Sequence, residues 1–407
     1  MKKAIKIIII TLLSLIAVIT ITVAVLFALY ADDIINENEP NFITLTSITE
    51  ELDSIALTTS MDLPDSIKRN LEDYDYLVSF VEENYAPFSA IMEKGYEQEY
   101  KAMRKQLRQQ VIQGEVGIEK AAIDYTLWFF SQFDRHISIQ TEAFWAIVHT
   151  LFPQDIEIVD YAPKTVSCKV DSCTWLIRVP SCYSNYREWT INAFQQFVES
   201  GCENLIIDVR GNGGGSVEVW NNYFTALYDH SGNPCISWFR NTPENWKSRE
   251  EYVEKNPSNP NAETIQAFIK KCRKSKKKFV LWGIWRGDTG LQPMVNIHRA
   301  AVLIDWNTAS AAESIVRFVK YNSDRAKVYG IGNTFGADQT GDVGYRNLPN
   351  SKIRFQYPTV VTSDFYDNDF SGTPGIAPDI IIPLPYATTL TDNIDEWVLW
   401  VAEDLKR

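Results

Sequence analysis

The stretch that decides the fold lies at residues 205–215 and reads Leu205-Ile206-Ile207-Asp208-Val209-Arg210-Gly211-Asn212-Gly213-Gly214-Gly215. Its first half predicts a strand buried on both faces, which is typical of a parallel sheet between helices. The consecutive glycines then allow a sharp turn whose N–H groups converge on one point, as in sites for phosphates or oxyanions. No Walker A lysine and no GxGxxG pattern follows, so the turn is either an anion-binding nest or a plain tight turn.

A second strand-to-helix turn follows downstream. Residues 301–305 predict another buried strand, and the segment Asn307-Thr308-Ala309-Ser310-Ala311-Ala312-Glu313 leads into a helix. At that position Ser310 is near the positive end of the helix dipole, and the N–H of Ala311 is an unpaired donor of the first turn. This arrangement suits a nucleophile with an oxyanion donor beside it, although an ordinary N-cap serine has the same local pattern.

Further strands at residues 174–179 and 328–331, with helical patterns between them, continue the strand–helix alternation on both sides. This alternation predicts an α/β core, which we assign to residues 141–390. Residues 230–260, rich in Pro, Asn and Trp, are expected to form an excursion or lid. A final amphipathic helix is expected within residues 391–407.

The part of the chain before this core has a different hydrophobic pattern. Three apolar stripes at helical spacing occupy residues 67–81, 96–111 and 118–129, separated near Pro87 and Gly114. They predict a small helical domain over residues 63–140, in which the aromatic side chains form the core.

The N-terminus predicts a membrane segment. Residues 7–30 are apolar apart from Ser and Thr and follow Lys2, Lys3 and Lys6. This length exceeds the hydrophobic region of a secretory signal, so an uncleaved transmembrane signal anchor over residues 1–31 is the first interpretation and a cleaved signal the second. The lysines keep the N-terminus inside. Residues 32–62 then form a stalk, and the body lies outside the cytoplasm at the cell membrane, or is secreted if the signal is cleaved.

Composition narrows the function classes. The 407 residues carry 39 Lys and Arg against 52 Asp and Glu, a formal charge of −13, so a nucleic-acid partner is not expected. The basic run at residues 270–278 is interpreted as a solvated helix end, with contact to lipid headgroups or peptide carboxylates as the alternative.

Six cysteines permit disulfides, and a Cys168–Cys173 bridge and free thiols are equally compatible with the sequence. Neither CxxC nor HExxH occurs, so no metal and no cofactor is expected.

One histidine has a setting suited to chemistry. His136 lies in Phe133-Asp134-Arg135-His136-Ile137-Ser138, between the helical domain and the α/β core. Clefts form at such junctions, although a lone histidine is more often structural. The other three histidines have no comparable setting.

Taken in order, these motifs resemble those of the tail-specific, or C-terminal processing, serine peptidases. The family carries Asp-x-Arg-x-Asn-x-Gly-Gly at a strand end, then Ser-Ala-x-Glu, then Gly-x-x-Pro-Asp. The matching segments here are residues 208–215, 310–313 and 375–379, and Thr334-Phe335-Gly336 matches a Thr-x-Gly segment. The resemblance covers about residues 170–385, and relatives often precede it with a helical unit that ends in Asp-x-His, here Asp134-Arg135-His136.

The resemblance implies a Clp-protease/crotonase-like α/β core, with Ser310 as the nucleophile. It implies oxyanion donors from the turn at Ser310 and Ala311 and from the glycine run at Gly213 and Gly214. If both strands end at the same edge of one sheet, these groups come together.

Two departures from the family pattern decide which branch the chain resembles. Many members use a Ser–Lys dyad, but Ala337 occupies the place of that lysine. The branch similar to the tricorn core protease uses a histidine base instead, and His136 matches it. The supporting Glu of that branch is replaced by the segment Ser371-Gly372-Thr373, so Asp367 or Asp369 is the candidate orienting acid.

Two functions follow from this resemblance. The first is a membrane-anchored serine endopeptidase that acts on peptides or unfolded proteins through an acyl-enzyme, with Ser310 as nucleophile and His136 as base. The second is a degenerate member that binds peptide chain ends without cutting them, as a scaffold or sensor.

Overall fold

The computed structural model describes residues 63–151, 162–232, 235–257, 261–285, 296–368, 370, 375–387, 389–391 and 394–407. The predicted signal anchor and stalk lie outside these residues, as does the candidate acid Asp369. None of the helices in the described ranges combines the length and the apolar character needed to cross a bilayer.

A six-stranded sheet forms the α/β core. Its strands follow the order β11-β8-β7-β4-β3-β2, and all neighbours are parallel except the β2–β3 hairpin. The strands are β2 (Val166–Lys169), β3 (Thr174–Arg178), β4 (Asn204–Asp208), β7 (Arg299–Leu303), β8 (Ala326–Gly330) and β11 (Ile380–Ile381). The predicted α/β class is therefore confirmed, and the stretch at residues 205–208 lies in a central strand.

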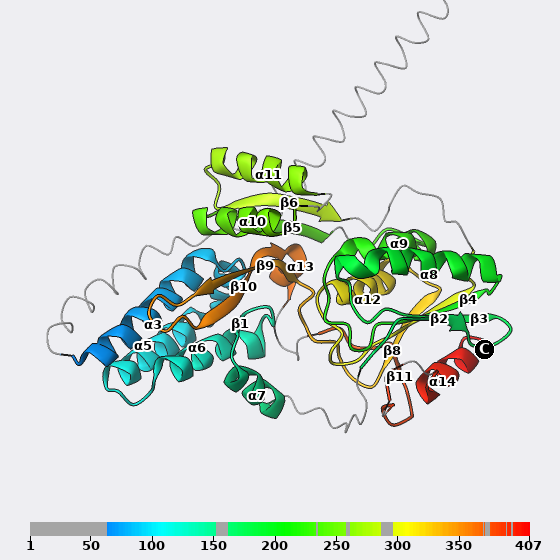
Figure 1. Ribbon diagram of the computed structural model, residues 1–407, viewed down its shortest axis with the longest axis horizontal. Helices are drawn as coiled ribbons and strands as arrows, with labels where there is room; N and C mark the ends of the chain where they lie inside the picture. The colour runs from blue at the N-terminus through cyan, green and yellow to red at the C-terminus, as the bar shows by residue number, and fades with distance from the viewer. Residues whose placement is uncertain are drawn as a thin grey trace, which may run out of the picture. The chain divides into compact units, whose positions relative to one another are not determined.

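Helices cover both faces of this sheet (Figure 1). On one face α8 (Arg187–Ser200), α9 (Asn221–Leu227) and α12 (Ala311–Asn322) pack on alternate residues of the strands, such as Leu205 and Ile207. On the other face α14 (Glu396–Asp404) packs on the intervening residues, such as Ile206. This two-sided burial explains why β4 is apolar at every position except its ends.

A second, antiparallel sheet was not predicted. It has the order β1-β10-β5-β6, with β9 also paired to β10. Its strands are β1 (Ser138–Ile139), β5 (Cys235–Arg240), β6 (Phe279–Trp285), β9 (Thr340–Asn347) and β10 (Arg354–Thr362). The described part of the expected lid therefore consists mainly of strand β5 and helix α10 (Pro243–Lys255). Helix α11 (Ala262–Lys274) follows α10 in the chain and precedes β6. The basic run begins near the end of α11, and its lysines are exposed.

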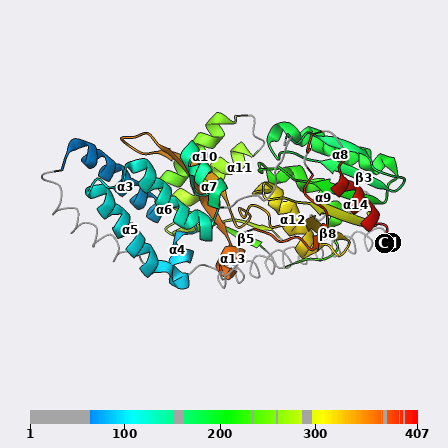
Figure 2. The same cartoon turned by 90° about the horizontal axis from the view of Figure 1, so that it is seen from below.

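The helices before the core follow the predicted pattern. The three long ones are α3 (Asp65–Asn84), α5 (Glu97–Ile112) and α6 (Ile118–Gln132), and they lie side by side in Figure 2. Two short segments separate α3 from α5, namely α4 (Phe88–Ile91) and a π-helical turn (Met92–Tyr96). Buried aromatic rings such as Tyr100 and Phe129, with centroids 5.9 Å apart, fill the space between them. After α6 the chain enters β1 and then α7 (Glu142–Leu151), so residues 133–137 connect the helices to the second sheet.

Candidate active site

The two predicted turns lie side by side at one edge of the six-stranded sheet. β4 and β7 are neighbouring parallel strands with Asp208 opposite Leu303, so their carboxyl ends meet where ligands bind in α/β sheets. The N–H of Ala309 donates to the carbonyl of Asn212 at 2.9 Å and joins the two turns. The glycine run is therefore a direct neighbour of the turn that carries Ser310.

Ser310 has a strained backbone at the start of α12. Its φ is 54° and its ψ −118°, a conformation that costs a non-glycine residue roughly 1–3 kcal/mol and is concentrated at functional sites. A serine on a strained strand-to-helix turn presents its hydroxyl away from the sheet, as nucleophile elbows do. Its own N–H is used locally, because it donates to Glu313 Oε2 at 2.7 Å.

The three-residue spacing between this serine and Glu313 has a structural explanation within this chain. Glu313 is fully buried, and its carboxylate also accepts hydrogen bonds from Thr334 Oγ1 and from the N–H groups of Gly336 and Ala337, at 2.6–2.8 Å. The carboxylate thus ties the serine turn to the Thr334-Phe335-Gly336 segment. Ala337, which stands in the place of the dyad lysine, contributes a backbone donor to this carboxylate.

Burial is the main cause that raises the pKa of Glu313, to about 7, and the nearby Asp338 carboxylate acts in the same direction. The hydrogen bonds that Glu313 accepts favour its charged form and act in the opposite direction. The Glu313 carboxylate holds the backbone of the turn and serves as its support.

His136 lies within hydrogen-bonding distance of Ser310. Its Nε2 is 3.1 Å from Ser310 Oγ, although 174 residues separate the two in sequence. The neighbouring Arg135 fixes the segment: its side chain is buried, stacks 4.2 Å from the centre of the Trp306 ring and donates to the carbonyl of Phe335. Burial lowers the pKa of Arg135 to about 10, with Glu313 acting in the opposite direction.

The other side of the His136 ring faces two residues that the sequence did not indicate as site residues. Nδ1 lies 2.7 Å from Thr340 Oγ1, and Thr340 Oγ1 in turn donates to Asp134 Oδ1 at 2.7 Å. The candidate acid Asp367 ends the short helix α13 (Ser363–Asp367) and makes no hydrogen bond or ion pair with His136 in the described part of the chain. Asp134 was visible in the Asp-x-His segment, whereas nothing local marks Thr340.

The predicted oxyanion donors need one correction. The N–H of Gly214 is already engaged, because it donates to Asn212 Oδ1 at 2.9 Å. Among the described residues, the N–H groups of Gly213 and Ala311 have no hydrogen-bond acceptor. These two donors flank the closest approach of the turns and are the ones available to a developing oxyanion.

Gly214 is instead the point where the two turns touch. Its φ is +98°, and a Cβ added there would lie 2.8 Å from both Ala309 O and Ser310 Cβ. Gly214→Ala is therefore expected to displace the serine turn and to lower kcat/KM of a reaction at the Ser310 hydroxyl about 100-fold, the usual scale for a misplaced reacting group. Steady-state kinetics measures this loss. The matched control is Gly332→Ala, where an added Cβ meets no atom within 4 Å; equal activities of the two variants would contradict this role of Gly214.

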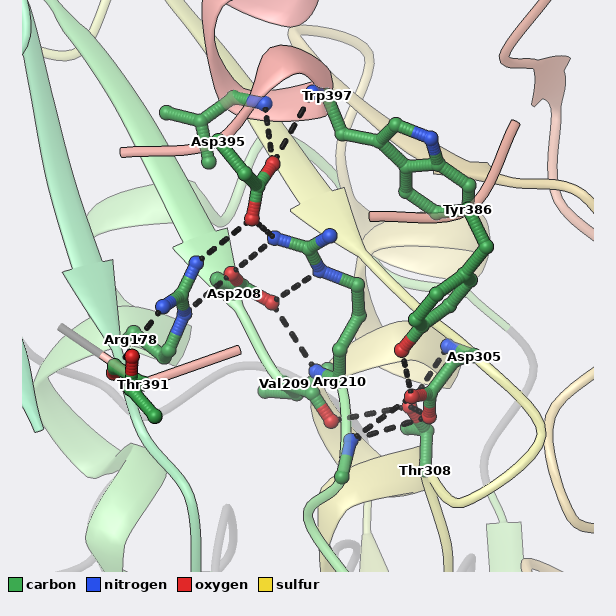
Figure 3. A network of polar contacts seen from close by, with 12 residues as sticks. Arg178, Asp208, Val209, Arg210, Asp305, Thr308, Tyr386, Thr391, Asp395 and Trp397 are labelled. Atoms are coloured by element: carbon green, nitrogen blue, oxygen red, sulfur yellow. Dashed lines mark hydrogen bonds and ion pairs between the residues drawn. The ribbon is translucent and has the colours of Figure 1, made fainter. Parts of the chain in front are cut away.

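The Asp-x-Arg part of the first motif is a buried support (Figure 3). Asp208 accepts hydrogen bonds from Arg210 at 2.7 and 2.9 Å and from Arg178 at 2.7 Å, and both arginines also contact Asp395 before α14. Burial alone would raise the pKa of Asp208, but the two guanidinium groups hold it well below its usual range. This network connects the end of β4 to the C-terminal helix and holds the glycine turn in place.

Asp305 accepts hydrogen bonds from both turns (Figure 3). Its carboxylate accepts hydrogen bonds from the N–H of Gly211 at 3.1 Å and from the hydroxyl of Tyr386 at 2.5 Å. The third motif is likewise structural, because Asp379 accepts from the N–H of Val328 and binds Lys320.

All six cysteines are free thiols, so the Cys168–Cys173 alternative of a disulfide is not realised. Within the described ranges, no group of three His, Cys, Asp or Glu side chains is arranged to hold a metal ion.

Residues 174–382, more than half of the chain, match the model of Peptidase family S41. The chain therefore belongs to peptidase family S41. A search of curated proteins finds no match.

Among solved structures, a putative peptidase from Parabacteroides merdae ATCC 43184 is similar at 15% identity, with 78% of this chain and 90% of that chain covered and a TM-score of 0.44. A lipoprotein from Streptococcus agalactiae is similar at 14% identity, with coverages of 85% and 98% and a TM-score of 0.43. Mature CPAF is similar at 13% identity, with coverages of 84% and 96% and a TM-score of 0.49.

Proposed function

We propose that this protein is a serine endopeptidase that cleaves peptides or unfolded protein chains through an acyl-enzyme, with Ser310 as nucleophile and His136 as general base. The observation that carries the proposal is the 3.1 Å contact between Ser310 Oγ and His136 Nε2. This contact lies on a strained turn at Ser310, and, among the described residues, the N–H groups of Gly213 and Ala311 are free donors next to that turn. A nucleophile, a base and oxyanion donors within one small volume are the parts that acyl transfer requires.

The reaction follows from this geometry. Ser310 Oγ forms a bond to the scissile carbonyl carbon while its proton passes to His136 Nε2. The carbonyl oxygen becomes an oxyanion, which the N–H groups of Gly213 and Ala311 stabilise. The C–N bond then breaks as the imidazolium returns the proton to the leaving amine. A water molecule, activated by the same imidazole, releases the acyl group and restores Ser310.

A histidine base, and hence the tricorn-core-like branch of the family, is part of this proposal. Two observations support it: Ala337 stands in the place of the dyad lysine, and Ser310 Oγ lies 3.1 Å from His136 Nε2.

We also propose that the catalytic body lies outside the cytoplasm, attached to the cell membrane through the N-terminal segment or secreted after its removal. The support is the sequence alone, an apolar stretch at residues 7–30 behind three lysines.

The test is digestion of a denatured protein, with new chain termini identified by mass spectrometry. The wild-type protein is expected to produce internal cleavages. A substrate that is bound yet stays intact over prolonged incubation would contradict the proposal and favour the binder of peptide chain ends.

A further inference from the structure

The proposed mechanism needs a group that orients the His136 ring, and the Glu of the family pattern is replaced here by the segment Ser371-Gly372-Thr373. We propose that Thr340 and Asp134 together take this part, as positioning residues arranged in the series Ser310–His136–Thr340–Asp134. This inference rests on the proposed function. In this arrangement the carboxylate does not bind the histidine directly; the threonine hydroxyl lies between them and contacts both.

The hydrogen-bond directions of this series fix the ring tautomer. A threonine hydroxyl has a single hydrogen, and Thr340 Oγ1 donates it to Asp134 Oδ1 at 2.7 Å. Toward His136 Nδ1, 2.7 Å away, the same oxygen can then only accept. Nδ1 therefore carries the ring proton, and Nε2 presents its lone pair to Ser310 Oγ. This is the tautomer that a general base needs.

The charge of Asp134 is available to the imidazolium that forms during catalysis. Its side chain is only 1% exposed, and Oδ1 lies 3.7 Å from His136 Nδ1, too far for a hydrogen bond but close for two charges in a buried site. In the described ranges no Lys or Arg pairs with Asp134, whose remaining partners are neutral donors. A buried carboxylate without a permanent cation is costly, and protonation of His136 supplies that cation.

The other groups that contact Asp134 are neutral donors, so they do not neutralise the charge of its carboxylate. Oδ2 of Asp134 accepts from the Tyr85 hydroxyl at 3.1 Å, and Oδ1 accepts from the N–H of His136 at 3.0 Å. Burial, and then Asp134, raises the pKa of Tyr85 well above its ordinary value, so Tyr85 stays a neutral donor. From β10, Gln356 donates to the carbonyl of His136. The histidine is thereby held from its backbone as well as from its ring.

The test compares three variants by kcat, KM and pH profile. Thr340→Val breaks the series and is expected to lower kcat about 100-fold with KM within about threefold, while Thr340→Ser restores kcat to within about threefold of wild type. Asp134→Asn removes the charge and keeps an acceptor oxygen for Thr340 and the N–H of His136, while the amide nitrogen takes the place of the oxygen that accepts from Tyr85. It is expected to lower kcat about 100-fold and to move the acidic limb of the profile to lower pH, because the imidazolium loses the carboxylate that stabilises it.

Thr359→Val is the matched control, since it removes another buried hydroxyl of the same sheet, one that donates to the carbonyl of Asp342. This control is expected to keep the wild-type kcat. Near-wild-type kcat in Thr340→Val, or an unchanged pH profile in Asp134→Asn, would overturn the inference while leaving the peptidase proposal intact. A wild-type protein that neither hydrolyses peptides nor reacts with a serine-directed phosphonate would overturn the proposed function itself.

Discussion

Ser310→Ala is expected to lower the rate of hydrolysis of an unfolded substrate by at least about three powers of ten, because loss of the nucleophile removes the acyl-enzyme route. Folding is expected to be retained, since alanine keeps the backbone N–H that donates to Glu313 Oε2 and removes only the hydroxyl. The rate is measured by initial velocities on a denatured protein, and folding by circular dichroism and thermal unfolding.

Ser314→Ala is the matched control for this variant. Ser314 lies in the first turns of the same helix α12 and is half-buried, away from the contact with His136. Wild-type rates are expected for this control. Full hydrolysis by Ser310→Ala would show that another residue carries the reaction and would remove the assignment of the nucleophile.

His136→Gln is expected to lower kcat by a factor of about 10² to 10⁴, the range that general acid–base catalysis contributes. Glutamine keeps the size and the polarity of the side chain but cannot accept the proton of Ser310 near neutral pH. The loss is measured as kcat over a range of pH.

For the histidine, the control is His149→Gln on the exposed face of α7, which is expected to leave kcat unchanged. If His136→Gln retained wild-type kcat, a base other than His136 would have to serve Ser310, and the tautomer argument for Thr340 and Asp134 would lose its basis.

The elements that the sequence predicted are those with a strong local signal. Residues 205–207 are apolar because β4 is buried between two helical layers, and this requirement can be read from a few consecutive positions. The glycine run and the Ser310 turn are equally local, because each is a strand-to-helix junction. Their proximity followed from the rule that neighbouring parallel strands end at one edge.

What could not be predicted depends on contacts between distant residues. Thr340 and Asp134 are separated by 206 positions, and their hydrogen bond exists only because β9 begins next to the end of α6. The second sheet joins β1, β5 and β10 from three distant parts of the chain, so no single segment indicated it. The engagement of the Gly214 N–H by Asn212 depends on a side-chain orientation that spacing does not specify.

The central claim is that Ser310 is an activated nucleophile, and covalent labelling tests it most directly. The folded protein is incubated with a fluorophosphonate, and the adduct is located by mass spectrometry of the digested protein. The account predicts one phosphonyl group per chain, on the peptide that contains Ser310, with labelling lost in Ser310→Ala and strongly slowed in His136→Gln. No adduct on the wild-type protein, or an adduct on a different serine, would contradict it.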